Sequence, residues 1–166
     1  MEAIDWEVVY HQELPRIYNF FRYRVGDSHQ AEDLTATTFE KAWCGRWRYK
    51  KNLAAFSTWL FTIARNVATD HFRRVHQEFS FEDINQEADL PRVEETIQQK
   101  QVLSRLSKLL ASLPSREQEL IALKYGAELS NREIARLTHL CESNVGTMLN
   151  RINIKLRSEL EVENER

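Results

Sequence analysis

The chain has 166 residues, of which 42% are hydrophobic and 29% charged, and its formal net charge is −2. This length and balance predict a soluble protein of one or two small domains. No apolar run approaches the ~20 residues of a membrane span, and the first residues lack the pattern of a signal peptide, so we expect no membrane insertion and a cytoplasmic location.

The composition favours helices. Glycine and proline are scarce, with four and three residues, whereas leucine, alanine, glutamate, arginine and glutamine are plentiful. An all-α fold is therefore predicted. The two cysteines, Cys44 and Cys141, are far apart and match no metal-binding spacing, so we expect reduced thiols, no metal and no cofactor.

Three helices are predicted in the first part of the chain. The first covers residues 5–25 and ends at Gly26, which can adopt the left-handed conformation of a helix C-terminus. The second runs from 28 to 43, after an Asp27-Ser28 N-cap, and the third from 56 to 74, with Ser57 available as its N-cap. The apolar faces expected are Ala31, Leu34, Thr38, Phe39 and Ala42 on the second helix, and Phe56, Trp59, Leu60, Ile63, Ala64 and Val67 on the third. The opposite face of the third helix carries Thr62, Arg65, Asn66, Thr69 and Arg73.

Charge is arranged in blocks along the chain. Residues 41–76 carry eight bases and one acid, whereas residues 1–40 carry eight acids and three bases, and residues 77–99 carry seven acids and one base. A basic block in an acidic protein is typical of a surface that binds a polyanion. A solvated basic face that balances the acidic segments explains these counts equally well.

The segment 44–55 interleaves cations with aromatic rings. Arg46, Arg48, Lys50 and Lys51 alternate there with Trp47 and Tyr49. Cations can follow phosphates and flat rings can stack on unpaired bases, each stacked base contributing about 1–3 kcal/mol, so the segment suits single-stranded or melting DNA. The alternative is that either ring only packs the loop onto the core.

The second part of the chain predicts a helix-turn-helix. Ser115 with Gln118, and Ser130 with Glu133, have the spacing of capping boxes, and Gly126 is expected to end the helix that Ser115 begins. After a short turn, a final helix should place Val145, Leu149, Ile152 and Leu156 on its inner face. A helical hairpin that makes no DNA contact is the alternative.

Four segments of the chain resemble, in chain order, bacterial RNA polymerase sigma factors of the extracytoplasmic-function (ECF) group. LPRIYNFFRYRVGDSHQAEDLTATTFEKAW and FSTWLFTIARNVATDHFRR are similar to region two of that family, and LPSREQELIALKYGAELSNREIARL with VGTMLNRINIKLR is similar to region four. The resemblance implies two small helical domains, region two in 1–76 and region four in 100–166, joined by a flexible acidic linker in 77–99. It also implies a sigma factor that directs promoter-specific initiation, with core RNA polymerase, promoter DNA and an anti-sigma factor as partners.

The resemblance further assigns roles to residues. Those expected to bind the clamp helices of the largest polymerase subunit are Asp33, Leu34, Thr38, Phe39 and Trp43, while region four would meet the flap region. The −10 element would contact Arg46, Trp47, Arg48, Tyr49, Lys50, Lys51, Asn52, Arg65, Asn66, Arg73 and Arg74. The −35 element would contact Arg132, Ser143, Asn144, Thr147, Asn150, Arg151 and Lys155.

The sequence departs from the family pattern in four places. Ala36-Thr37 replaces a common Gln-Glu pair, and Trp59-Leu60 replaces the tandem tryptophans of the primary sigma factors. His139 replaces the turn glycine and must adopt a left-handed conformation, and Cys141 is a weak residue for a helix N-cap.

Three alternatives follow. An enzyme is excluded because no nucleophile with a base, phosphate-binding loop or pair of converging carboxylates is present. A helix-turn-helix regulator that never binds polymerase leaves the first unit unexplained. A sigma-like interaction module without initiation activity stays open because the recognition helix carries few bases.

Overall fold

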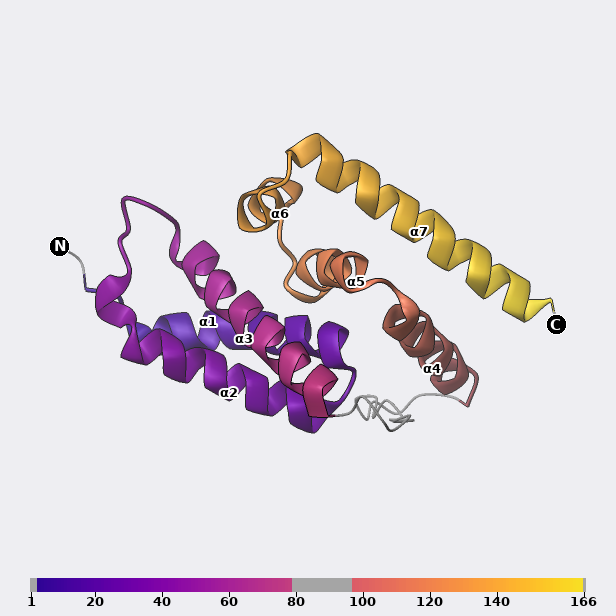
Figure 1. The fold of residues 1–166 in the computed structure, drawn as a ribbon, viewed down its shortest axis with the longest axis horizontal. Helices are drawn as coiled ribbons and strands as arrows, with labels where there is room; N and C mark the ends of the chain where they lie inside the picture. Colours follow the sequence, from indigo (N-terminus) through magenta and orange to yellow (C-terminus); the bar gives the residue numbers. More distant parts are fainter. Residues whose placement is uncertain (1–2, 79–96, 166) are drawn as a thin grey trace.

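The computed structural model describes residues 3–78 and 97–165, and all regular secondary structure in these residues is helical (Figure 1). The all-α prediction is therefore confirmed. The helices are α1 (Trp6–Val25), α2 (Ser28–Cys44), α3 (Phe56–Glu78), α4 (Ile97–Ser112), α5 (Ser115–Ile121), α6 (Asn131–Thr138) and α7 (Glu142–Asn164). A 3-10 turn, η1 (Arg46–Arg48), follows α2, and a π-helical turn, η2 (Ala122–Gly126), extends α5. Most of the predicted linker falls on residues 79–96, outside the described residues.

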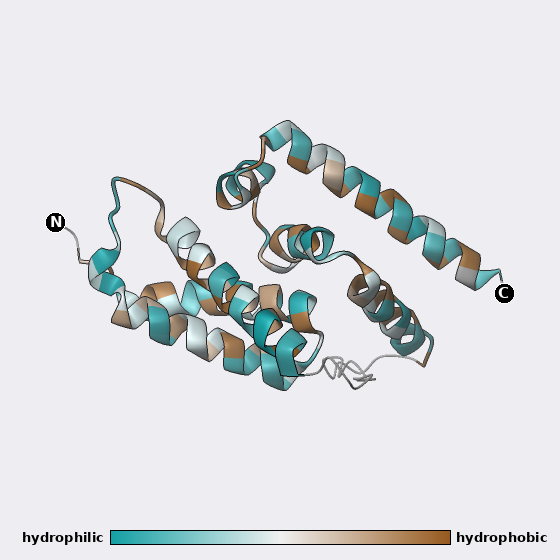
Figure 2. Ribbon diagram, viewed as in Figure 1, coloured by the Kyte–Doolittle hydropathy of each residue, from teal (hydrophilic) through white to brown (hydrophobic). Residues whose placement is uncertain are grey.

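Helices α1, α2 and α3 form the N-terminal unit. The Phe20 ring centroid lies 5.1 Å from that of Phe21 and 6.0 Å from that of Phe61, and all three side chains are fully buried. Figure 2 shows hydrophobic and hydrophilic residues alternating around these helices, as amphipathic packing requires. Phe61 was missing from the predicted apolar face of α3, and Phe56, Trp59 and Ile63 are only partly buried.

Most of the capping residues that the sequence predicts for these helices are found at their ends. Gly26 has φ 73° and the Asp27 carboxylate accepts a hydrogen bond from the Gln30 backbone N–H, so both predicted caps are confirmed. The predicted Ser57 cap is wrong, because α3 already begins at Phe56 and the Ser57 hydroxyl accepts a hydrogen bond from Nη1 of Arg16 at 3.2 Å. A side chain from α1 therefore uses the group that the sequence assigned to the helix end.

Helices α4 to α7 form the C-terminal unit, in which α6 and α7 make the predicted helix-turn-helix. The four inward residues expected on α7 are buried, and the Ser130–Glu133 capping box is complete. His139 has φ 57° and Cys141 occupies the N-cap of α7 without a side-chain hydrogen bond, as predicted. Helix α4 was not among the predicted elements.

The predicted capping box at Ser115 is wrong. The N-cap of α5 is Pro114, which makes no side-chain hydrogen bond. Nη2 of Arg24 donates to the Ser115 hydroxyl at 3.4 Å, and Nη1 of Arg24 donates to Oε1 of Gln118 at 3.2 Å. Both side chains that the local pattern reserved for a helix end are thus contacted by α1 of the other unit.

The two units pack directly against each other. Turn η2 lies on α1 so closely that a Cβ built on Gly126 would sit 2.8 Å from the backbone oxygen of Asn19. Only glycine permits this approach, because backbone atoms cannot move aside as a flexible side chain can. The predicted role of Gly126 as the cap that ends the helix of Ser115 is wrong, because α5 ends at Ile121 and the C-cap of η2 is Ala127.

Candidate nucleic-acid interface

The loop after α2 presents a stack of two indoles around one guanidinium. Cζ of Arg46 lies 4.1 Å from the Trp43 ring centroid and 4.8 Å from that of Trp47, and Nη1 of Arg46 donates to the Trp43 carbonyl at 2.8 Å. Arg46 is held in place by these contacts, while Trp47 is 82% exposed and Trp43 49% exposed. The structure therefore offers a fixed cation beside a ring whose face is open to a base.

The two aromatic residues of this loop have different environments. The Tyr49 ring centroid lies 5.3 Å from those of Phe56 and Trp59, and its hydroxyl donates to the Ala54 carbonyl at 3.1 Å. Tyr49 thus packs the loop onto α3, as the alternative reading proposed for either ring, whereas Trp47 does not. The cations and amide around them, Arg48, Lys50, Lys51 and Asn52, are exposed.

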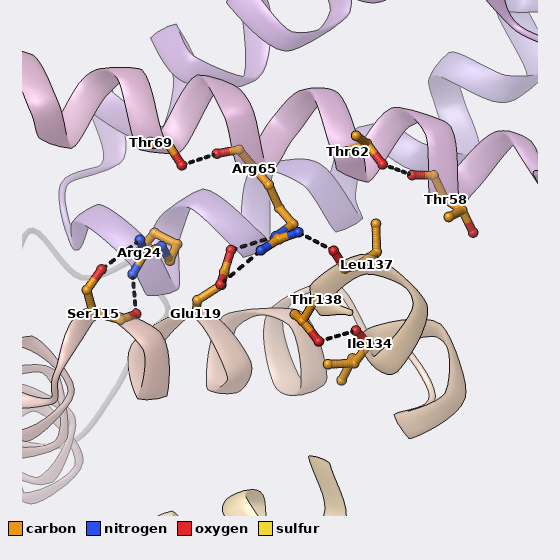
Figure 3. Close-up of polar contacts among 10 residues, drawn as sticks. All are labelled: Arg24, Thr58, Thr62, Arg65, Thr69, Ser115, Glu119, Ile134, Leu137 and Thr138. Carbon is orange, nitrogen blue, oxygen red and sulfur yellow. Dashed lines mark hydrogen bonds and ion pairs between the residues drawn. The ribbon is translucent and has the colours of Figure 1, made fainter. Parts of the chain in front are cut away.

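The outer face of α3 is divided. Asn66, Arg73 and Arg74 are exposed. Oδ1 of Asp70 lies 3.8 Å from Nη1 of Arg73, and the Asp70 backbone carbonyl accepts a hydrogen bond from Nε of Arg74. Arg65 instead turns toward the C-terminal unit (Figure 3). Its Nε donates to Oε1 of Glu119 at 2.7 Å, its Nη2 donates to Oε2 of the same residue at 3.3 Å, and its Nη1 donates to the Leu137 carbonyl.

Arg65 is one of three arginines, with Arg16 and Arg24, that lie along the contact between the two units. We call this contact the seam. Nε of Arg16 donates to the Ala127 carbonyl at 2.9 Å, and Nη1 of Arg24 donates to the Ser115 carbonyl at 3.1 Å (Figure 3 shows Arg24 and Arg65). Arg24 is buried with its Cζ 4.6 Å from the Phe72 ring centroid, and this burial lowers the pKa of its guanidinium. Sequence reasoning missed the seam, because its partners lie on different units.

The residues expected to bind polymerase on α2 are not equally accessible. Leu34 and Thr38 are buried in the core of the N-terminal unit, and the Thr38 hydroxyl donates to the Leu34 carbonyl. Asp33 is exposed, Trp43 belongs to the indole stack, and Phe39 lines a hollow of about 610 Å³ between α1 and α2. Of the five predicted residues, the accessible ones are therefore Asp33, Phe39 and Trp43.

The exposed face of α7 carries the residues predicted to contact the −35 element. Arg132 of α6 is exposed as well. The exposed residues on α7 are Ser143, Asn144, Thr147, Asn150, Arg151 and Lys155. Nε of Arg132 lies 3.7 Å from Oε2 of Glu142, an exposed pair at the start of α7. The face presents amide, hydroxyl and cationic groups beyond a buried apolar face, which is the arrangement a recognition helix needs.

Comparisons with known proteins agree with this architecture. Residues 9–79 match the family Sigma-70 region 2, and residues 103–156 match the family Sigma-70, region 4. The chain is 30% identical to the ECF RNA polymerase sigma factor RpoE of Cereibacter sphaeroides over 145 residues, which cover 86% of this chain and 77% of that protein. The chain belongs to the ECF RNA polymerase sigma factors. As a sigma factor it directs promoter-specific transcription initiation.

Two further relatives extend the comparison. The sigma factor is 26% identical to the ECF RNA polymerase sigma factor SigM of Bacillus subtilis over 151 residues, which cover 90% of this chain and 91% of that protein. Its fold matches that of the sigma factor RpoE from Bartonella quintana, solved in complex with the anti-sigma factor NepR, with a TM-score of 0.79, 23% identity and coverage of 96% of this chain and 99% of that chain.

Two features are absent from the described residues of this sigma factor. No group of three or more histidine, cysteine, aspartate or glutamate side chains in residues 3–78 and 97–165 is placed to hold a metal ion. Within the same ranges no helix has the length and hydropathy needed to cross a membrane.

Proposed function

We propose that residues 1–76 act as region two and residues 100–166 as region four, each reading one promoter element. The loop after α2 and the outer face of α3 would hold the single-stranded −10 element. The exposed face of α7 would enter the major groove at the −35 element. The chain itself would carry out no chemistry and act in the cytoplasm, where core RNA polymerase supplies the polymerising activity.

The observation that carries this proposal is the environment of Trp47. Its indole is exposed, lies over an arginine that is already fixed, and is surrounded by exposed cations that can follow a phosphate backbone. A tryptophan with no other role would ordinarily bury more of its surface. A base that leaves the duplex during melting would find in Trp47 a stacking surface that needs no rearrangement.

The proposed partners follow from the surfaces that remain. The hollow between α1 and α2, with Phe39 on its wall and Asp33 nearby on α2, would receive the clamp helices of the largest polymerase subunit, and region four would meet the flap region. An anti-sigma factor is proposed as an inhibitor, supported by the Bartonella quintana complex of a protein with the same fold.

The test is open-complex formation by the reconstituted holoenzyme on a promoter of this sigma factor, followed by permanganate reactivity of unpaired thymines. Trp47→Ala should lower the extent of melting about tenfold, since one stacked base contributes about 1–3 kcal/mol. Leu53→Ala is the matched control, because Leu53 is an apolar residue of the same loop and is 75% exposed, close to the 82% of Trp47. Equal melting by both variants would contradict the role of Trp47.

A further inference from the structure

The contact between Arg65 and Glu119 joins a residue expected to bind the −10 element to a residue of the C-terminal unit. Arg65 lies on the face of α3 that region two would turn to the −10 strand, and Glu119 lies on α5 of region four. Three donors of the Arg65 guanidinium are taken up by Glu119 and the Leu137 carbonyl, and the side chain is 26% exposed. A guanidinium in this bidentate pair cannot present the same edge to a phosphate or a base.

The other two arginines of the seam make similar polar contacts, beside the packing of η2 on α1, where Ala122 and Leu123 are buried. Arg16 and Arg24 donate to backbone carbonyls of the C-terminal unit. Nε of Arg24 has no hydrogen-bond partner among the described residues although it is buried. Each such hydrogen bond makes only a modest net contribution to stability, because the same groups bond to water when the seam is open. Because part of the seam is polar, it costs less free energy to open than a wholly apolar contact of the same area.

From this arrangement we propose that the packed form of the chain is self-inhibited, with the C-terminal unit covering the Arg65 part of the −10 surface. The inference rests on the proposed function of that surface. A −10 strand can contact Arg65 only when the seam is open, so closed molecules bind the strand through the other exposed residues alone and the apparent affinity is lowered. The recognition face of α7 stays exposed in the packed form, so the restraint acts on −10 recognition and not on the −35 contact.

A substitution at Gly126 can open the seam without altering either proposed DNA surface or Arg65 itself. Gly126→Ala would place a Cβ 2.8 Å from the Asn19 backbone oxygen and 3.0 Å from Cδ2 of Tyr23, both on α1. Gly146→Ala is the matched control, because its Cβ would meet only Nδ2 of Asn131 at an ordinary 3.5 Å. Glu119→Gln is a second, milder variant that removes the charge opposite Arg65 without adding an atom near α1.

The first readout is a distance between the two units. The chain has two cysteines, Cys44 and Cys141, one in each unit and both exposed, so they can be spin-labelled without further mutation. Pulsed electron paramagnetic resonance should give one narrow distance distribution for the wild type and for Gly146→Ala. It should give a longer, broader distribution for Gly126→Ala. A wild-type distribution as broad as that of Gly126→Ala would overturn the proposal.

The second readout is binding of a fluorescent oligothymidine by the free chain, measured by anisotropy. We expect Gly126→Ala to bind about tenfold more tightly than the wild type, which is the gain predicted if the wild type is open about one tenth of the time. Glu119→Gln should bind with an intermediate affinity. Adding Arg65→Gln to Gly126→Ala should remove most of that gain. An opened variant that binds no more tightly, or a gain that persists without Arg65, would overturn the proposal.

Failure of the proposed function gives a different result. In that case neither the wild type nor Gly126→Ala would produce promoter-specific starts with core RNA polymerase, whatever the distances between the labels. Promoter-specific starts by both proteins, together with equal oligothymidine affinities in spite of a shifted distance distribution, would reject self-inhibition alone.

Discussion

Nε of Arg65 lies 2.7 Å from Oε1 of Glu119, so a cation on the outer face of α3 is neutralised by the C-terminal unit. Both side chains are less than one third exposed, which distinguishes this pair from the ion pairs on the surface of the molecule. The pair thus links the packing of the two units to the availability of a surface proposed to bind DNA.

Glu119→Gln should lower the free energy of unfolding by about 1 kcal/mol, because it weakens a partly buried, charge-assisted pair. The control is Asp70→Asn, which affects the exposed Asp70–Arg73 pair at 3.8 Å and should cost about 0.3–0.5 kcal/mol at most. Urea denaturation of the full chain measures both values. Equal losses for the two variants would show that burial adds nothing to the Arg65–Glu119 pair.

Phe61→Ala should cost about 3–5 kcal/mol of unfolding free energy, since the fully buried ring packs against Phe20 and its removal leaves a cavity. Trp47→Ala removes a larger ring but should change stability by less than about 0.5 kcal/mol, because most of that indole is already in water. Thermal and urea unfolding compare the two. A large loss for Trp47→Ala would mean that this ring stabilises the fold.

Asn150→Ala should cost about 1–3 kcal/mol of discrimination between −35 sequences, as expected for loss of a base contact in the major groove. Lys155→Ala should instead weaken binding to all sequences alike and reduce the salt slope of log K by about one. Val162→Ala, near the far end of α7, is the control. Holoenzyme binding to a series of −35 variants at several salt concentrations separates these outcomes, and identical behaviour of all three variants would rule out the proposed recognition face.

The stability of the chain should fall as the pH drops below about 6.5. Burial, together with the nearby Arg74, lowers the pKa of the His71 imidazole from its ordinary value of 6.5. Between that lowered pKa and 6.5 the unfolded chain binds more protons than the folded chain, so protons favour unfolding in this window.

His71→Gln should flatten this part of the pH dependence, whereas His29→Gln, at an exposed position of α2, should leave it in place. Urea midpoints measured between pH 5 and pH 8 provide the comparison. An unchanged slope in His71→Gln would assign the acid sensitivity to another group.

Local patterns predicted most of the helices and their ends, because the interactions that fix them lie within one turn. The Ser130–Glu133 capping box, the left-handed Gly26 and His139, and the inner face of α7 depend on neighbours in the sequence. Ser115 and Gln118 have the same local pattern as Ser130 and Glu133, yet both side chains contact Arg24, more than 90 residues away. No periodicity in one segment contains that information.

The candidate site was predictable to a similar degree. Composition and the family resemblance pointed to the loop around Trp47, but they could not distinguish its exposed ring from the packed ring of Tyr49. That difference depends on the position of Phe56 and Trp59 after folding. Likewise, helical periodicity placed Arg65 correctly on the outer face of α3, while its partner Glu119 comes from a unit whose position the sequence did not reveal.

The most direct test is run-off transcription on fragmented genomic DNA of the source organism, using core RNA polymerase with and without this sigma factor and sequencing every start site. We predict new start sites that share two upstream elements, one near −10 and one near −35, and that depend on Asn150 and Trp47. The absence of new start sites with a folded protein would contradict promoter-specific initiation by this chain.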